Sequence, residues 1–243
     1  MINFDNVDNR DIGYFISKLD KIDYILLREI IEKHFNELIR KNLKIDKNIN
    51  FSDYLNKFDQ SNHANLFSKK NRILPEKYFN ILFDSLNIFK KLKNIFEEFT
   101  ITDEEKVGYG NFYWRIVRPY PKKDVGTMHK DKWFWDLGTG EMDDSKYKRY
   151  KLWISIDGES KLGFKYVPGS PNLNLNYKFK IEDNKKKPVF DEKILDKNQI
   201  ISLKGDRGTY IIFHDELLHG GEMLHNEIPR VSIECTIQVL KKT

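Results

Sequence analysis

His129 and Asp131 stand two residues apart in the triplet His129-Lys130-Asp131. In a strand, side chains i and i+2 point to the same face with Cα atoms roughly 6.6 Å apart. An imidazole nitrogen and a carboxylate oxygen placed in this way can meet on one metal ion. The triplet is weak by itself, because a chain with six histidines and many aspartates has a fair chance of containing one.

A second histidine follows a predicted strand. The apolar run Tyr210-Ile211-Ile212-Phe213 is followed by His219, Gly220 and Gly221, and glycines there let the backbone pass close to other atoms. Arg230 stands eleven residues after His219 and can bind a carboxylate through two parallel hydrogen bonds. Two neutral imidazoles and one carboxylate leave three positions open on an octahedral ion, as in the ligand set of non-haem Fe(II) oxygenases.

His214 competes with His219 for the place of the second imidazole. The residue eleven positions after His214 is His225 and not an arginine, which favours His219. Cys235 is expected to fill the core, because it falls on the apolar face of the last predicted strand.

The elements that must position these residues change character near residue 106. Before it, apolar residues recur at helical spacing, which predicts one helix over 22–39, another over 79–99 and a shorter one near 51–58. From Val107 onward the period shifts to two. The predicted strands span 111–120, 151–156, 164–167, 199–203, 209–214 and 230–240.

The strands 151–156 and 230–239 are each polar on one face and apolar on the other. The amphipathic helices can cover the apolar faces, while the polar faces point to solvent or into the mouth of a barrel. Helices followed by short strands predict a mainly β protein with an α layer. We expect a single domain over 1–243, with a helical N-terminal layer (1–105) and a β core (106–243).

Composition excludes several classes of protein. The 40% of hydrophobic residues argues against disorder, the 33% of charged residues and short apolar runs argue against a membrane protein, and the single cysteine excludes a disulfide framework. The net charge of +5 is a small difference between 42 basic and 37 acidic residues, and the lysine-rich stretch 122–132 is interpreted as a solvated turn. A cytoplasmic protein without a nucleic-acid or membrane partner is expected, and the oligomeric state is unknown.

Residues 107–240 resemble the phytanoyl-CoA dioxygenase-like family of Fe(II)/2-oxoglutarate-dependent oxygenases. The resemblance rests on His129-Lys130-Asp131, on the strand 151–157 that ends in Asp, on the turn Val167-Pro168-Gly169-Ser170, on His219 and on Pro229-Arg230-Val231-Ser232. It implies a double-stranded β-helix (a jelly-roll or cupin-like barrel) with the N-terminal helices packed on one sheet.

The resemblance also implies roles for these residues. His129, Asp131 and His219 would hold Fe(II), while Arg230, with Ser232 on the same polar face, would bind 2-oxoglutarate. Together with O2, 2-oxoglutarate would be converted to succinate and CO2. Asp131 favours hydroxylation or desaturation, because related halogenases lack this carboxylate.

Further cosubstrate contacts are expected from three residues. Gly221 stands where some members of the family place a serine on 2-oxoglutarate, and Arg115 or Arg118 is expected to compensate. Trp135 stands where the related ectoine hydroxylases have a tryptophan beside the cosubstrate.

The substrate is expected to be a small molecule: a metabolite, a natural-product intermediate or an activated sugar. Trp133 and Trp153 can form an aromatic wall over the iron, and Lys151 suggests an anionic group on substrate or cosubstrate. The alternative is a non-catalytic or isomerase-type cupin-like barrel that binds a metabolite or sugar. A nucleic-acid demethylase of the same superfamily is disfavoured, because no basic stripe is present.

Overall fold

The computed structural model describes residues 2–102, 110–120, 124–138, 146–158, 161–182, 184–223, 225 and 228–241. The expected boundary between residues 105 and 106 lies outside them. Within these ranges, no helix combines the length and the apolar character that a membrane span requires.

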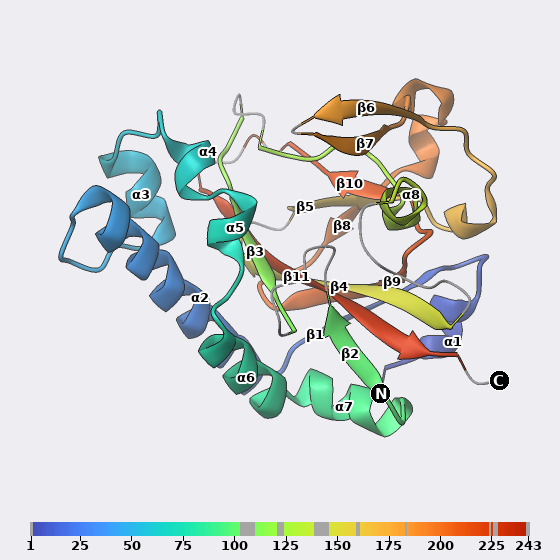
Figure 1. Ribbon diagram of the computed structural model, residues 1–243, viewed down its shortest axis with the longest axis horizontal. Helices are drawn as coiled ribbons and strands as arrows, with labels where there is room; N and C mark the ends of the chain where they lie inside the picture. The colour runs from blue at the N-terminus through green and yellow to red at the C-terminus, as the bar shows by residue number, and fades with distance from the viewer. Residues whose placement is uncertain are drawn as a thin grey trace.

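The largest of the three sheets that the described residues form lies at the centre of the molecule (Figure 1). Its strand order is β1-β9-β4-β11-β2, and β3 also pairs with β11, on the half of β11 that β2 leaves open. The pairs are antiparallel, and β4 and β11 are the longest strands. The strands are β1 (Tyr14–Lys18), β2 (Phe99–Thr102), β3 (Tyr113–Val117), β4 (Tyr147–Asp157), β9 (Thr209–His214) and β11 (Arg230–Leu240).

A three-stranded sheet of order β10-β5-β8 faces the inner side of the large sheet. Phe164 of the small sheet packs on Trp153 and Phe213 of the large one, with ring centroids 5.2 and 5.5 Å apart. A separate hairpin, β6 (Lys178–Glu182) with β7 (Lys185–Val189), lies beside this sheet (Figure 1). The small sheet consists of β5 (Lys161–Tyr166), β8 (Ile201–Lys204) and β10 (His219–Gly221), and short 3-10 turns span Ser170–Asn172, Glu192–Ile194 and Lys197–Gln199.

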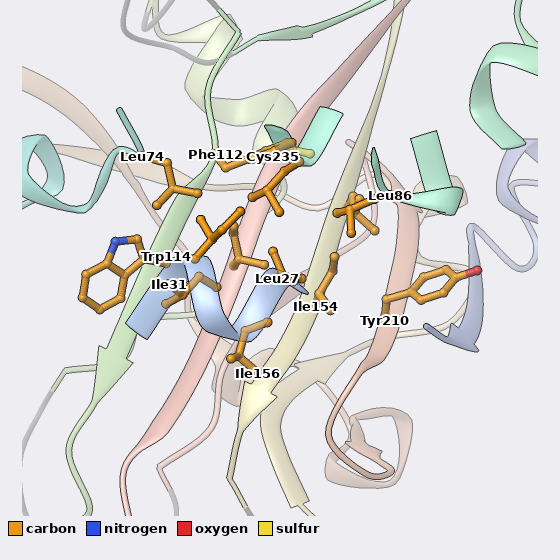
Figure 2. Packing of buried hydrophobic residues seen from close by; sticks show 14 of the residues in the cluster. Leu27, Ile31, Leu74, Leu86, Phe112, Trp114, Ile154, Ile156, Tyr210 and Cys235 are labelled. Atoms are coloured by element: carbon orange, nitrogen blue, oxygen red, sulfur yellow. The ribbon is translucent and has the colours of Figure 1, made fainter. Parts of the chain in front are cut away.

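Helices cover the outer face of the large sheet, as the apolar strand faces predict. Leu27 and Ile31 of the first long helix pack in one core with Ile154, Ile156 and the buried Cys235 (Figure 2). The inner faces of the same strands carry polar residues. The helices are α1 (Phe4–Asp8), α2 (Lys21–Leu43), α3 (Phe51–Lys57), α4 (His63–Leu66), α5 (Lys69–Arg72), α6 (Glu76–Ser85), α7 (Asn87–Ile95) and α8 (Asp131–Asp136).

The helical layer differs from the prediction in two respects. The expected helix over 79–99 is wrong: it divides at Leu86, whose backbone is extended, into α6 and α7. Asp23 of α2 stabilises this break, because its carboxylate accepts the first backbone N–H of α7, from Asn87, at 2.7 Å. The helix over 22–39 is confirmed, but Ile22 is 79% exposed instead of buried.

The N-terminal part is also less purely helical than expected. β1 pairs with β9 at one edge of the large sheet, and β2 pairs with β11 at the other. Chain segments from before and after the predicted change of texture therefore share one sheet and one hydrophobic core.

Candidate metal centre

His129, Asp131 and His219 converge in space. Their ligand atoms all lie within 4.8 Å of one another. Nε2 of His129 lies 3.8 Å from Oδ1 of Asp131, and Nε2 of His219 lies 3.6 Å from Oδ2 of the same carboxylate. Two nitrogens and one carboxylate therefore face a common point, from segments ninety residues apart in the chain.

An isolated antiparallel bridge brings the two histidines together. The backbone N–H of each donates to the carbonyl of the other, at 2.8 and 2.9 Å. Gly220 and Gly221 allow this approach, because a Cβ atom there would lie 3.0 Å from the Met128 backbone and 2.7 Å from Cβ of Val125, respectively. The glycines were predicted to let the backbone pass close to other atoms. Those atoms belong to the segment that carries His129.

Both imidazoles are held in the tautomer that a metal requires. Nδ1 of His129 lies 2.8 Å from the Thr127 carbonyl, and Nδ1 of His219 lies 2.9 Å from the Leu217 carbonyl. A carbonyl oxygen only accepts, so each Nδ1 carries the hydrogen and each Nε2 presents its lone pair. Burial lowers the pKa of His219 to about 4, despite the opposing effect of Asp131, and keeps this ring neutral at physiological pH.

Asp131 reaches the site from the start of α8 and not from a strand. Lys130 before it is extended, and Asp131 is the first helical residue, so the predicted strand spacing is wrong although the carboxylate meets the imidazoles. Burial raises the pKa of Asp131, but Lys151 and the two imidazoles outweigh it, and the pKa lies below its ordinary value. Its Oδ2 atom is buried and accepts no hydrogen bond from any described residue.

Aromatic rings surround the imidazoles. Phe164 stacks on His219 with centroids 5.4 Å apart, and Phe213 packs against the same ring at 4.6 Å. Phe134 meets His129 edge-on at 5.2 Å. These contacts limit the rotation of the two imidazole rings.

Arg230 opens β11 with a buried guanidinium. Its Nη1 donates to the carbonyl of Gly163, and its Nε is buried without a partner among the described residues. Gly163 has φ +69°, and a Cβ atom at this position would lie 2.4 Å from Nη1 of Arg230. Burial lowers the pKa of Arg230 to about 10, which still leaves it charged at neutral pH.

A cavity of about 650 Å³ extends from Arg230 past the three converging residues to the hairpin β6–β7 and α5. Its lining is strongly charged. Besides His129, Asp131, His219 and Arg230, it includes Lys69, Arg72, Tyr113, Arg115, Asp124, Thr127, Phe134, Lys151, Trp153, Gly163, Phe164, Lys180, Glu182, Lys186, Lys187, Gly220, Gly221, Ser232 and Glu234.

Four of the other residues predicted for the site line this cavity: Arg115, Lys151, Trp153 and Ser232. Arg115 forms an ion pair with Glu234, in which its Nε and Nη2 atoms lie 3.0 and 2.9 Å from Oε1. Lys151 donates to the Thr236 hydroxyl at 3.1 Å. The polar faces of β4 and β11 therefore point into the cavity.

Three predicted residues are not among the described residues that line the cavity. Arg118 binds both carboxylate oxygens of Asp124, at 2.6 and 2.7 Å. Trp133 packs in a separate core, where its ring stacks on Tyr177 with centroids 4.7 Å apart. Trp135 is buried with the Arg149 guanidinium 4.6 Å above its ring.

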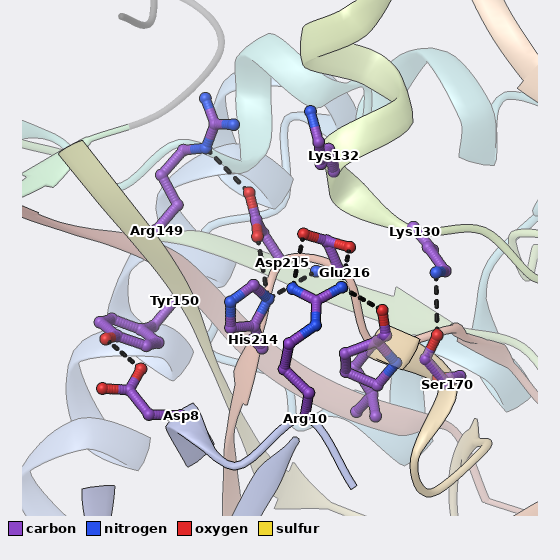
Figure 3. Close-up of polar contacts among 12 residues, drawn as sticks. Asp8, Arg10, Lys130, Lys132, Arg149, Tyr150, Ser170, His214, Asp215 and Glu216 are labelled. Carbon is purple, nitrogen blue, oxygen red and sulfur yellow. Dashed lines mark hydrogen bonds and ion pairs between the residues drawn. The ribbon is translucent and has the colours of Figure 1, made fainter. Parts of the chain in front are cut away.

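His214, the alternative histidine, lies in a different polar cluster (Figure 3). Its Nδ1 lies 3.2 Å from the Asp215 carboxylate and accepts the backbone N–H of Glu216 at 3.1 Å. Arg149 donates to Asp215, and Arg10 pairs with Glu216. The two carboxylates are thus neutralised by arginines, unlike the carboxylate of Asp131.

The sequence interpretation missed the residues that support the site. Asp124 belongs to the stretch interpreted as a solvated turn, yet its bonds to Arg118 anchor the segment leading to His129. Glu192 accepts the Met128 backbone N–H at 3.0 Å and fixes the same segment. Of the supporting residues, only Gly163 could have been found from the sequence. A glycine next to a predicted strand often marks a place where another group, here the Arg230 side chain, approaches the backbone closely.

Comparisons with known proteins show the family that the chain resembles. The model of the family described as phytanoyl-CoA dioxygenase (PhyH) matches residues 31–232. No curated protein matches the chain.

Solved structures resemble the whole chain at low sequence identity. EvdO2 from Micromonospora carbonacea var. aurantiaca, complexed with 2-oxoglutarate, has a TM-score of 0.60 and 14% identity over 100% of this chain and 94% of its own. EctD from S. alaskensis, with 2-oxoglutarate and 5-hydroxyectoine, has a TM-score of 0.54 and 14% identity over 97% and 74%. The carbocyclase SnoK from nogalamycin biosynthesis has a TM-score of 0.57 and 11% identity over 98% and 84%. These likenesses confirm the predicted fold, a double-stranded β-helix with an α layer, whose two sheets do not close into a barrel.

Proposed function

The chain belongs to the phytanoyl-CoA dioxygenase family of 2-oxoglutarate-dependent oxygenases, and from this we propose that it hydroxylates an unactivated C–H bond of a small molecule. In this reaction 2-oxoglutarate and O2 are converted to succinate and CO2. His129, Asp131 and His219 hold Fe(II), and Arg230 binds 2-oxoglutarate.

The observation that carries the proposal is the buried Asp131 carboxylate between two imidazole lone pairs. Its Oδ2 atom lacks a hydrogen-bond donor in the described part of the chain, and both Nδ1 hydrogens are already used on backbone carbonyls. Leaving a buried carboxylate oxygen without a hydrogen-bond donor is costly. A divalent cation would satisfy all three groups, and a two-histidine, one-carboxylate set suits Fe(II) with positions left open.

Arg230 is suited to hold the distal carboxylate of 2-oxoglutarate. The Gly163 carbonyl fixes one side of the guanidinium, while the buried Nε atom has a hydrogen to donate. Because burial weakens competition from water, a charge-assisted bond at this position contributes about 1.5–3 kcal/mol. Ser232, two residues along β11, lines the cavity next to it.

When bound, Fe(II) with 2-oxoglutarate supplies the oxidising chemistry that activates O2 and removes hydrogen from an unreactive C–H bond. The protein contributes placement. The aromatic rings around His129 and His219 restrict the rotation of both imidazoles, and the tautomers fixed by Thr127 and Leu217 keep both Nε2 atoms directed at one point.

The size of the cavity supports a small-molecule substrate. Its volume of about 650 Å³ falls within the range of roughly 300–1,000 Å³ typical of small-molecule sites. Trp153 and Phe164 provide an aromatic wall on one side, against which a ring or chain can pack.

The test is succinate formation from 2-oxoglutarate by the full-length protein with Fe(II), together with the bound metal per chain. We expect turnover in the wild type and loss of both readouts in H129A, D131A and H219A, with H214A as the matched control that retains them. A wild type that binds the metal but forms no succinate with any of a broad panel of metabolites would favour the non-catalytic barrel. Metal binding and turnover retained in all three variants would overturn the metal assignment.

A further inference from the structure

We infer that Tyr113 and Glu234 bind a hydroxyl group of the substrate, and that Trp153 packs against the carbon skeleton that carries this group. These three residues line the cavity and form a binding row on one of its walls. The inference rests on the proposed function, because it specifies the class of small molecule that the same cavity accepts: an alcohol or a polyol.

The binding row crosses three neighbouring strands on the inner face of the large sheet. Glu234 of β11 lies opposite Tyr113 of β3 on one side and opposite Trp153 of β4 on the other. Neighbouring strands are about 4.8 Å apart, so the row spans roughly 10 Å. Trp153 is the end of the row on the side of the candidate metal centre. Its ring lies 5.2 Å from that of Phe164, which stacks on His219 with centroids 5.4 Å apart.

Tyr113, at the other end of the row, has a hydroxyl group without a partner. The residue is 5% exposed, and its hydroxyl is buried with no hydrogen-bond partner in the described part of the chain. The ring is held in place, since Nζ of Lys69 lies 5.1 Å from its centroid and the Tyr113 backbone forms a bridge with Ile73. Buried hydroxyls are normally paired, as in Tyr150, which donates to Asp8 at 2.6 Å. A ligand oxygen in the cavity would supply the partner that Tyr113 lacks.

Glu234, next to Tyr113, provides a charged acceptor. Burial raises the pKa of this carboxyl group, but Arg115 and Lys151 outweigh burial and keep the pKa well below its usual range, so the group is ionised. Nε and Nη2 of Arg115 lie 3.0 and 2.9 Å from Oε1 of Glu234. A carboxylate can accept about four hydrogen bonds, and the Glu234 side chain remains 23% exposed, so it has capacity for a donor from the cavity.

This pair of side chains selects a hydroxyl group. A hydroxyl can donate its hydrogen to the Glu234 carboxylate and accept the hydrogen of the Tyr113 hydroxyl at the same time. A carbonyl group can only accept, and an ammonium group can only donate. The Arg115 guanidinium already compensates the charge of Glu234, so a ligand cation is not required there. Trp153 adds an aromatic surface that suits the ring or chain bearing the hydroxyl.

The experiment is calorimetric titration of the full chain with three probes that share one ring and differ in one group: cyclohexanol, cyclohexanone and cyclohexylamine. Fe(II) and saturating 2-oxoglutarate are present and O2 is excluded, so that Arg230 is occupied and no turnover takes place. We expect cyclohexanol to bind about tenfold more tightly than cyclohexanone, because only the alcohol can donate to the carboxylate. Cyclohexylamine should bind more weakly than cyclohexanol, because its ammonium group cannot accept the hydrogen of Tyr113.

Two conservative substitutions assign the binding to the row. Tyr113→Phe removes only the hydroxyl and should weaken the binding of both cyclohexanol and cyclohexanone about threefold or more, since both accept from it. Glu234→Gln puts an amide in place of the charged acceptor and should reduce the preference for the alcohol over the ketone to about twofold or less. Tyr150→Phe is the matched control, because Tyr150 is a buried tyrosine in the core under the helices. Circular dichroism checks that each variant is folded.

Thermal unfolding separates ligand binding from a structural role of the Tyr113 hydroxyl. Tyr113→Phe removes a group without a partner, so the Tm should stay the same or rise. Tyr150→Phe removes a hydrogen bond to the Asp8 carboxylate and should lower the Tm by about 3 °C or more. A Tm that falls as far in Tyr113→Phe as in Tyr150→Phe would mean that the Tyr113 hydroxyl already has a partner in the free protein, and would overturn the inference.

Three titration results would also overturn it: cyclohexanone or cyclohexylamine binding as tightly as cyclohexanol, no cyclohexanol binding up to its solubility limit, or the same probe affinities in Tyr113→Phe as in the wild type or in Tyr150→Phe. Failure of the proposed function is distinct from these results. It would appear as absent succinate formation while the probe affinities keep the expected order.

Discussion

The backbones of His129 and His219 are hydrogen-bonded to each other in both directions, and each imidazole donates through Nδ1 to the carbonyl two residues before it. The two Nε2 atoms are therefore oriented by the same local geometry on two distant segments. Asp131 enters between them from the first residue of α8. The candidate metal centre is thus assembled mainly by backbone contacts, which explains why glycines follow His219.

Replacing Asp131 with asparagine separates the effect of the carboxylate charge on folding from its effect on metal binding. Without metal, D131N should be less stable than the wild type at neutral pH, because the lowered pKa of Asp131 means that the folded protein favours its ionised form over a neutral one. A divalent metal at 100 times its Kd should stabilise the wild type by about 2.7 kcal/mol and leave D131N unchanged. Thermal unfolding with and without metal measures both effects, and equal stabilisation of the two proteins would contradict the assignment.

Replacing Arg230 with alanine should raise the KM for 2-oxoglutarate about 10- to 150-fold, which corresponds to the loss of about 1.5–3 kcal/mol. Steady-state succinate formation measures this change. Arg207→Ala is the control, since Arg207 is half-exposed and pairs with Asp157. An unchanged KM in R230A would mean that another group holds the cosubstrate.

A pair of glycine substitutions tests how Arg230 is positioned. Gly163 and Gly138 both have left-handed backbones, at φ +69° and +79°, but an added Cβ meets Arg230 at Gly163 and open space at Gly138. Both alanine variants should lose about 1–2 kcal/mol of stability from backbone strain. Only G163A should also raise the KM for 2-oxoglutarate, and a similar rise in G138A would exclude this steric explanation.

Asp124 should support metal binding without touching the metal. It accepts hydrogen bonds from the backbone and guanidinium of Arg118 at 3.0, 2.7 and 2.6 Å, and so fixes the segment that carries Thr127 and His129. D124A is expected to weaken metal affinity about 10- to 100-fold, as outer supports of metal ligands commonly do. Metal titration measures the affinity, and D206A, which removes an exposed ion pair with Lys18, should have no effect.

The buried His34 makes stability depend on pH. Its Nδ1 accepts the indole N–H of Trp114 at 3.0 Å, and burial lowers its pKa from 6.5 to about 4. The unfolded chain therefore binds a proton that the folded chain does not between pH 6.5 and 4. Stability should fall as pH decreases through this window, by at most about 1.4 kcal/mol per pH unit for this residue. Urea unfolding at several pH values measures the slope, which should flatten in H34Q.

The sequence by itself determined the layer structure and predicted the residues of the candidate site. Periodicity of two on β4 and β11 fixes which side chains face inward, and amphipathic helices must cover the opposite faces, so the architecture follows from hydrophobic burial alone. The spacing of His129, Asp131, His219 and Arg230 also indicated the family. Such patterns are local or ordered along the chain, and the sequence therefore preserves them.

Only the tertiary structure decided which candidates share the cavity. Arg115 lies on β3 and Arg118 follows it directly, so the sequence does not distinguish their roles. In the structure, Arg115 pairs with Glu234 of β11, whereas Arg118 pairs with Asp124. The break at Leu86 depends on Asp23 from another helix, and Asp131 starts a helix where strand spacing was expected. These outcomes depend on partners distant in sequence, because ion pairs, helix caps and close backbone approaches form only when the folded chain brings both partners together.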